Sequence, residues 1–193
     1  MITELPVEAR DTGRIAAPAR ILLDTLKNLP DQPVTFTLDE ETYTIEISSA
    51  NGRYKLAGEN AADFPRVPVV KGSAPIEMPS SSLARAINKT MCAVSTDELR
   101  PAMTGILVQL ADSQVTFVAT DGHRLAFASA ALEVEVPKQE VILPRKTVIE
   151  LQRLLSDKEG AIEMQFAPNQ ARFSFEGMEF VTKLVEGKFP DYN

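Results

Sequence analysis

The only histidine of the chain, His123, lies in the run VATDGHRLAF (118–127), two positions after Asp121 and directly before Arg124. An imidazole between a carboxylate and a guanidinium could serve as a general base, a metal ligand or a fixed part of a turn. A catalytic histidine needs a nucleophile or a substrate pocket with a second oriented group. The sequence contains no G-x-S-x-G, phosphate-cradling glycine loop or H-E-x-x-H motif. We therefore predict a histidine that is hydrogen-bonded within its turn.

Metal and disulfide chemistry are limited by the same composition. Cys92 is the only cysteine, so the chain cannot form an internal disulfide. One cysteine and one histidine are too few for a closed zinc site. We expect no catalytic residue, no metal and no cofactor.

The elements that position His123 are predicted to be two antiparallel strands. Residues 115–120 and 123–130 are rich in β-formers and are separated by Asp121-Gly122. An Asp-Gly pair supplies the positive φ angles of a tight type I′ turn. The return strand is expected to begin at His123.

A repeat of helix plus three strands organises the rest of the chain. Two amphipathic helices are predicted to begin at Pro18 and Pro144, 126 positions apart, and both repeats end in Phe-Pro. A middle unit has serine caps before its helix. The predicted helices lie at 18–29, 79–92 and 144–155, and the strands at 34–38, 42–47, 53–57, 104–111, 113–120, 123–130, 162–167, 171–175 and 179–185.

A proline-rich segment at 64–79 is the expected domain boundary, since prolines stand at 65, 68, 75 and 79. Units two and three then pair into one domain, which leaves unit one as half of another. No run approaches the roughly 18 apolar residues of a membrane span, and charges occupy the place of a signal peptide's apolar run. We expect a soluble, cytoplasmic protein.

Charge is segregated between the predicted helices and the rest of the chain. The three helix windows hold seven basic and two acidic side chains, a net charge of +5. Since the whole chain carries −7, the residues outside these windows sum to −12. Within 18–29 and 144–155, basic residues recur seven positions apart on one helix face. Solvated helix faces are often charged, but the recurrence favours a polyanion such as DNA. Without a recognition helix, contacts should go to phosphates and ignore base sequence.

Three segments resemble the bacterial sliding clamp, the beta subunit of DNA polymerase III: ATDGHRLA (119–126), LPRKTVIEL (143–151) and TKLVEGKFPDY (182–192). The resemblance covers nearly the whole chain. It implies an α+β DNA-clamp fold, homodimeric as a full-length ring, with helices around a hole for double-stranded DNA and sheets outside. Residues 1–67 would be the C-terminal half of the first clamp domain. Residues 68–193 would be the second, with half-units 68–135 and 136–193 and no third domain.

The resemblance also implies two sets of binding residues. Short apolar peptides of the DNA polymerase III alpha subunit, the clamp loader and repair polymerases would bind a pocket formed by Met103, Thr120, Gly122, His123, Arg124, Leu125 and Pro190. DNA would contact Arg20, Lys27, Arg85, Lys89, Arg100, Arg145, Lys146 and Arg153.

One loop departs from the family pattern, because Pro101 and Ala102 stand where many members have aromatic residues. Stacking on bases is not available there, so a DNA contact of this loop would fall to Arg100. Two other functions remain open: an enzyme using His123 with Asp121, and an acidic scaffold that binds peptides without touching DNA.

Overall fold

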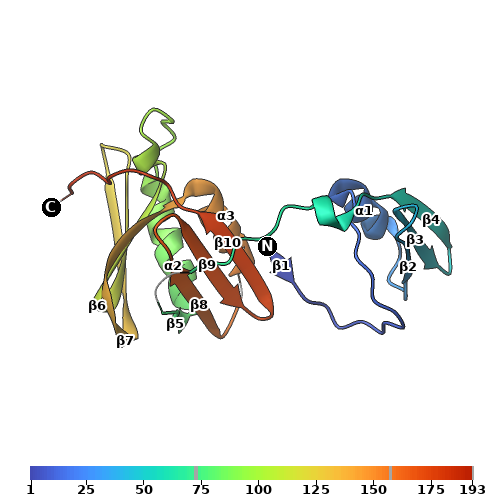
Figure 1. Ribbon diagram of the computed structural model, residues 1–193. Helices are drawn as coiled ribbons and strands as arrows, with labels where there is room; N and C mark the ends of the chain where they lie inside the picture. Colours follow the sequence, from blue (N-terminus) through green and yellow to red (C-terminus); the bar gives the residue numbers. More distant parts are fainter. Residues whose placement is uncertain (72–73, 157, 193) are drawn as a thin grey trace. The chain divides into compact units, whose positions relative to one another are not determined.

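The computed structural model describes residues 1–71, 74–156 and 158–192 (Figure 1). The chain divides into two units, a smaller one of Pro6–Val67 and a larger one of Met1–Leu5 with Pro68–Asn193. The first five residues, expected in the smaller unit, belong to the larger one. The cause is backbone pairing, because β1 (Ile2–Thr3) adds an edge strand to β10 (Met178–Lys183).

The smaller unit is one helix on a three-stranded antiparallel sheet. Its elements are α1 (Ala19–Asn28), β2 (Thr35–Asp39), β3 (Thr44–Ser49) and β4 (Gly52–Ala57), with sheet order β2-β3-β4. Alternation along the central strand buries Ile45 and Ile47 at 2% and 0% exposure. No residue of α1 is fully buried. This half-unit therefore has a thin core.

Proline begins each long helix of the protein. Pro18, Pro79 and Pro144 are the N-cap residues of α1, α2 (Ser80–Thr90) and α3 (Arg145–Leu154), and none of the three caps with a side chain. The predicted serine caps of the middle helix are wrong, since the serines lie inside its first turn. Proline suits this place for two reasons. It has no N–H group, and an N-cap residue needs none for the helix; it also disfavours the helical conformation for the residue that precedes it.

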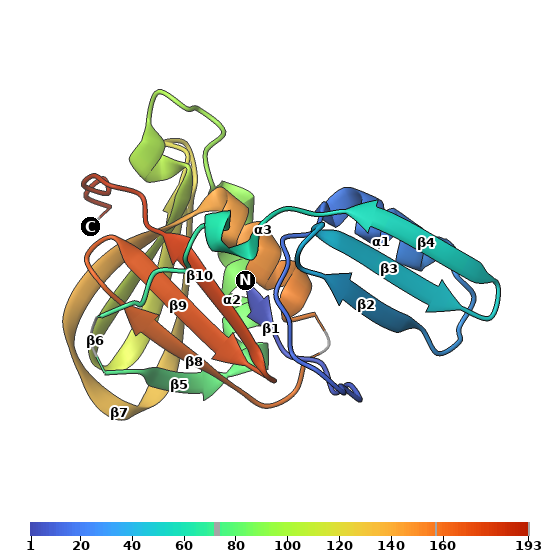
Figure 2. The same ribbon diagram turned by 45° about the vertical axis from the view of Figure 1, so that its right-hand side comes forward.

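The larger unit has two antiparallel layers behind which the helices pack. One is a five-stranded sheet of order β1-β10-β9-β8-β5, and the other is a ribbon of β6 (Gly105–Thr120) with β7 (Leu125–Pro144). The sheet strands not yet located are β5 (Ile76–Pro79), β8 (Ala161–Phe166) and β9 (Gln170–Phe175). Figure 2 shows α2 and α3 behind the sheet, with the ribbon curving beside it.

One core joins these layers of the larger unit. Leu83 and Ile87 of α2, Leu151 of α3, Phe117 of the ribbon and Phe173 of the sheet are all fully buried in it. The sheet's other face is polar, where an Arg172 guanidinium bridges Glu163 and Glu179 at 2.9 and 3.1 Å. Helices thus cover one side of the sheet and water the other, in agreement with the predicted α+β class.

The ribbon differs from the predicted meander. Segments 104–111 and 113–120, expected as separate strands, lie in the single strand β6 with a register shift between Leu110 and Gln114. Asp112 takes a φ of 53° inside this shift. The two ends of β6 nevertheless meet, since Met103 lies against Gly122 and Leu107 shares a cluster with Val118, so the chain reverses within this strand. β7 also runs across the expected half-unit boundary at 135/136.

Candidate functional site

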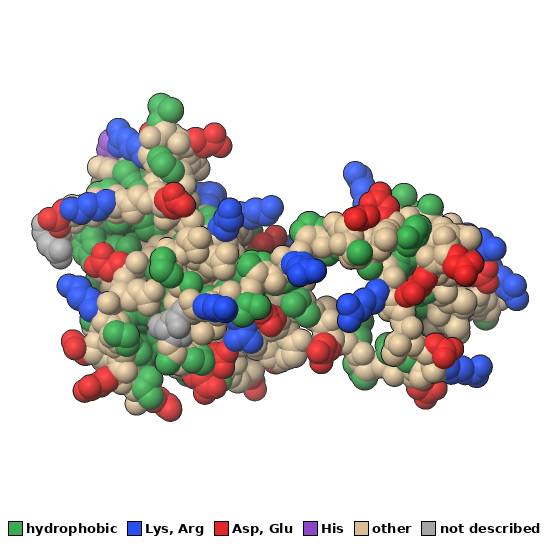
Figure 3. All heavy atoms as spheres, viewed as in Figure 1, with side chains coloured by type: hydrophobic (Ala, Val, Ile, Leu, Met, Phe, Trp, Pro, Cys, Tyr) green, Lys and Arg blue, Asp and Glu red, His purple; other side chains and the backbone are tan. Residues whose placement is uncertain are grey.

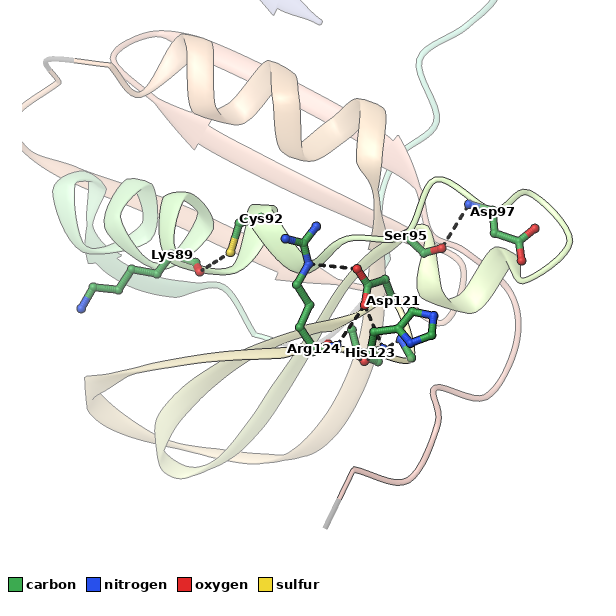
Figure 4. Close-up of polar contacts among 9 residues, drawn as sticks. Lys89, Cys92, Ser95, Asp97, Asp121, His123 and Arg124 are labelled. Carbon is green, nitrogen blue, oxygen red and sulfur yellow. Dashed lines mark hydrogen bonds and ion pairs between the residues drawn. The ribbon is translucent and has the colours of Figure 1, made fainter.

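A four-residue turn, Asp121–Arg124, joins the two ribbon strands and carries the only histidine (Figure 4). The Asp121 Oδ1 accepts hydrogen bonds from the backbone N–H groups of His123 and Arg124, each at 3.0 Å. The Arg124 Nε donates to Asp121 Oδ2 at 2.9 Å. One carboxylate therefore holds the second half of the turn.

Thr120 closes the same turn from its first end. Its hydroxyl donates to the Arg124 carbonyl at 2.8 Å and accepts from the Gly122 N–H at 3.1 Å. Gly122 has a φ of 89°, a left-handed value that favours glycine. The predicted type I′ turn at Asp121-Gly122 is wrong, because only Gly122 has positive φ and the return strand begins at Leu125. A two-residue turn with two positive φ values occurs instead at Glu176-Gly177.

His123 is exposed and uses its backbone for the turn. Figure 4 shows its imidazole extending to one side while the Arg124 side chain folds back over Asp121. Among the residues that the structure describes, no hydrogen bond joins this ring to a nucleophile or a carboxylate. The prediction of a turn histidine is confirmed by the backbone bond to Asp121.

The same contacts set the ionisation of Asp121. The hydrogen bonds from the backbone N–H of His123, then of Arg124, lower the pKa of the Asp121 carboxyl from 3.8 to about 2. The Arg124 guanidinium adds to the shift. The carboxylate is therefore charged throughout the neutral range and accepts all three bonds.

An apolar cluster lies on the outer face of the ribbon, away from the main core. Leu107, Val118 and Ile142 are covered there by Phe189, with Tyr192 packed at the edge. The C-terminal segment is held in place by the Val185 N–H, which donates to the Ile142 carbonyl at 3.0 Å, and by a hydrogen bond between the Tyr192 hydroxyl and Gln109 Oε1.

The loop before β6 reaches the same turn. A Cβ on Gly122 would lie 3.7 Å from Met103 Cε and 3.5 Å from Arg100 Nη1. Met103 is 7% exposed, whereas Arg100 is exposed and pairs with Asp97 at 3.6 Å. Arg100, predicted to contact DNA, thus lies beside the proposed peptide pocket.

The predicted pocket residues fall into a buried and an exposed set. Met103 and Thr120 are buried, while Leu125 is 49% exposed beside the turn. Pro190 is exposed and follows the buried Phe189. Met103 lies against Gly122 of the turn, and Val118 of the outer cluster stands two residues before Thr120.

A second candidate surface is the exposed face of α2 and α3. The two helices pack side by side, and Gln152 Nε2 donates to Asn88 Oδ1 between them. Arg85, Lys89, Lys146 and Arg153 are exposed, whereas Arg145 is half-buried. Arg85 and Lys89 line a depression of about 860 Å³ together with Lys158 and Glu159.

The remaining predicted DNA contacts, Arg20 and Lys27, lie in the smaller unit. Both are exposed on α1, seven positions apart, on the side away from its sheet. On the face of the larger unit seen in Figure 3, basic and acidic side chains are interspersed with apolar ones. Segregation of charge is therefore a property of the helices and not of that face.

Several residues at both surfaces were not predicted from the sequence. Phe189 and Tyr192 cover the outer cluster, and Lys158 joins the helix depression. The repeated Phe-Pro pair was a signal for Phe189, since a large apolar residue at a repeated position tends to be buried. No local pattern marks Lys158, which a turn after α3 brings to the helix face.

The described residues contain neither a metal-binding cluster nor a membrane-spanning helix. Within residues 1–71, 74–156 and 158–192, no group of three or more His, Cys, Asp or Glu side chains is placed to hold a metal ion. In the same ranges, no helix has the length and hydropathy needed to cross a membrane.

Comparison with known proteins relates both units to one family. Residues 77–191 match the model of the DNA polymerase III beta subunit, central domain, and residues 1–68 that of its N-terminal domain. A beta sliding clamp of Staphylococcus epidermidis is 35% identical over 185 residues, which are 96% of this chain and 49% of the relative. The chain thus spans about half the length of the curated relatives it matches.

Solved structures agree with this relation. The beta subunit of Pseudomonas aeruginosa DNA polymerase III superposes with a TM-score of 0.89 at 34% identity, over 96% of this chain and 51% of that one. The sliding clamp of Bacillus subtilis gives 0.90 at 29% identity, over 98% and 52%. Since the central-domain model alone covers more than half of the residues, the chain belongs to the family of DNA polymerase III beta subunits, the sliding clamps.

Proposed function

We propose that the chain is part of a sliding clamp that encircles double-stranded DNA and tethers replication proteins to it. It performs no bond chemistry itself. Residues 1–67 serve as the C-terminal half of the first clamp domain and residues 68–193 as the second, and the full-length protein closes as a homodimer. The observation that carries this proposal is the family membership of both units, with the exposed cations on the helices.

The peptide site is proposed at the turn end of the ribbon. Half-exposed Leu125 offers apolar surface, and His123 and Arg124 offer polar groups at its rim. Such a floor and rim suit short apolar peptides of the DNA polymerase III alpha subunit, the clamp loader and repair polymerases. A related clamp of Pseudomonas aeruginosa has been solved bound to griselimycin, which supports a ligand site in this family.

Calorimetry tests the peptide part of the proposal. The probe is a synthetic octapeptide that ends in Leu-Phe, titrated into the parent protein and into its Leu125→Asp variant. Leu125→Asp should weaken binding by about tenfold or more, because it buries a charge against the apolar ligand. An unchanged affinity of this variant would remove the peptide site from the turn.

The competing function is an acidic peptide-binding scaffold that does not touch DNA, favoured by the net charge of −7. The two functions differ in salt dependence. A clamp should bind duplex DNA weakly, without sequence preference, and less well as salt rises. Absence of binding at low salt in the full-length protein would favour the scaffold.

A further inference from the structure

Two loops of the chain are built on the same aspartate motif. In the smaller unit, Asp39 Oδ1 accepts hydrogen bonds from the N–H groups of Glu41 and Thr42, at 3.0 and 3.1 Å. In the larger unit, Asp121 Oδ1 accepts from the residues two and three positions later, both at 3.0 Å. One carboxylate oxygen is therefore sufficient to hold such a turn.

Of these two turns, the one at Asp121 adds an ion pair with an arginine to this motif. The second oxygen, Oδ2, accepts from Arg124 Nε at 2.9 Å, whereas Asp39 has no basic residue at the matching position, which is Thr42. The Arg124 side chain is 64% exposed. Exposed ion pairs contribute little to stability. The Asp121–Arg124 pair is thus more than the turn requires.

The consequence of the pair is a fixed guanidinium. Bonded through Nε, Arg124 keeps the N–H groups of both Nη atoms for other acceptors. Its backbone is held by the same carboxylate and by the Thr120 hydroxyl. An arginine ordered before a ligand arrives loses less entropy on binding than a free one.

We propose that Asp121 is a positioning residue of the peptide site: it holds Arg124 so that the outward guanidinium N–H groups donate hydrogen bonds to an oxygen of the bound peptide. The same carboxylate fixes the backbone at His123, and Leu125 follows directly. This inference rests on the proposed peptide site and adds the specificity that the site favours ligands with a carbonyl or carboxylate oxygen beside their apolar residues.

The experiment compares four single variants and one double variant in calorimetry with the octapeptide ending in Leu-Phe, as free acid and as C-terminal amide. Asp121→Asn keeps an oxygen for the turn amides but loses the acceptor for Nε. Asp121→Ala loses both. Arg124→Ala removes the guanidinium. Asp39→Ala is the matched control, because it removes the same turn motif outside the site.

We expect Asp121→Asn and Arg124→Ala each to weaken binding by about five- to tenfold, and Asp39→Ala to leave it unchanged. The Asp121→Asn/Arg124→Ala double variant should be no weaker than Arg124→Ala alone, because both changes remove one arrangement. If Arg124→Ala loses more affinity for the free acid than for the amide, the C-terminal carboxylate of the peptide is the acceptor. If it loses the same affinity for both peptides, the acceptor is a peptide carbonyl.

A spectroscopic readout separates positioning from folding. In NMR spectra of the parent chain, the Arg124 Nε–H signal should be shifted and should exchange slowly with water. In Asp121→Asn it should have the shift and exchange rate of a solvent-exposed arginine. The lone His123 ring reports whether the turn itself persists. Additive losses, or parental affinity of Asp121→Asn, would overturn the inference. If Arg124→Ala and Leu125→Asp also bind as the parent does, the proposed peptide site fails with it.

Discussion

Phe189 and Phe64 stand before proline at matching places of the repeat, yet Phe189 is 8% exposed and Phe64 is 65% exposed. The difference follows from what lies against them. In the larger unit, the outer face of the ribbon, with Leu107 and Val118, covers the Phe189 ring. The smaller unit contains a single helix-plus-sheet half and gives Phe64 no such cover among its described residues.

Phe189→Ala should destabilise the larger unit by about 3 kcal/mol, near the lower end of the range for core phenylalanines because the ring retains some exposure. Phe64→Ala should change the stability of the smaller unit by less than about 0.5 kcal/mol. Hydrogen exchange followed by mass spectrometry resolves the two units. If Phe64→Ala lowered the stability of its unit as much as Phe189→Ala lowers that of the larger unit, the Phe64 ring would have to be buried in solution.

Gly105 begins β6 where the backbone of the partner strand leaves no room. A Cβ there would lie 2.2 Å from the Leu143 carbonyl oxygen. Since backbone cannot rotate aside, Gly105→Ala should push the strands apart and cost about 1–3 kcal/mol in thermal unfolding. Ser113→Ala, on the exposed bend of the same strand, is the control and should melt as the parent does. If both variants had the same melting temperature, the strands at this end of the ribbon could separate enough to admit a Cβ at little cost in stability.

The sequence predicted the helices and most strands because their signals are local. Alternation and proline determine β2 to β4 and the starts of α1 and α3, each within a few residues. The ribbon was less predictable. Asp112 was expected between two strands, but it lies inside the single strand β6, because pairing with β7 continues on both sides of it. The paired residues lie up to 39 positions apart, between Gly105 and Pro144.

The candidate site shows the same limit. The turn at Asp121-Gly122 was located from its dipeptide, but its type was not, because the Thr120 hydroxyl and the Asp121 carboxylate stabilise a longer loop. The contact of Phe189 with Leu107 joins residues more than 80 positions apart. No local pattern encodes such a contact. The repeated Phe-Pro pair indicates only that Phe189 is buried, not which residues it contacts.

The titration of Asp121 provides a third prediction. Its pKa is lowered to about 2 in the folded chain, against 3.8 for the ordinary carboxyl. A depressed pKa means that the stabilisation is complete above pH 3.8 and is lost as the pH falls toward 2. NMR of the carboxyl carbon should give a midpoint near 2. Arg124→Ala should leave most of the shift, since the His123 N–H bond is its largest cause. A midpoint near 3.8 in the parent chain would contradict the hydrogen bonds to the turn.

The exposed cations of α2 and α3 provide the last prediction, which concerns DNA. Arg85 and Lys89 stand one turn apart on α2, and Lys146 and Arg153 two turns apart on α3. A phosphate contact releases counterions, so each contact adds about 0.9 to the slope of log K against log salt. Replacing a contacting lysine with alanine should reduce the slope by about that amount.

The measurement is anisotropy of a labelled duplex with the full-length protein over a series of salt concentrations. Lys89→Ala and Lys146→Ala should each lower both affinity and slope, on any duplex sequence, because phosphates carry no base information. Lys138→Ala, an exposed lysine on β7, is the control and should change neither. If Lys138→Ala lowers the slope as much as the helix variants do, DNA is attracted by general charge, and the helices do not form its binding face.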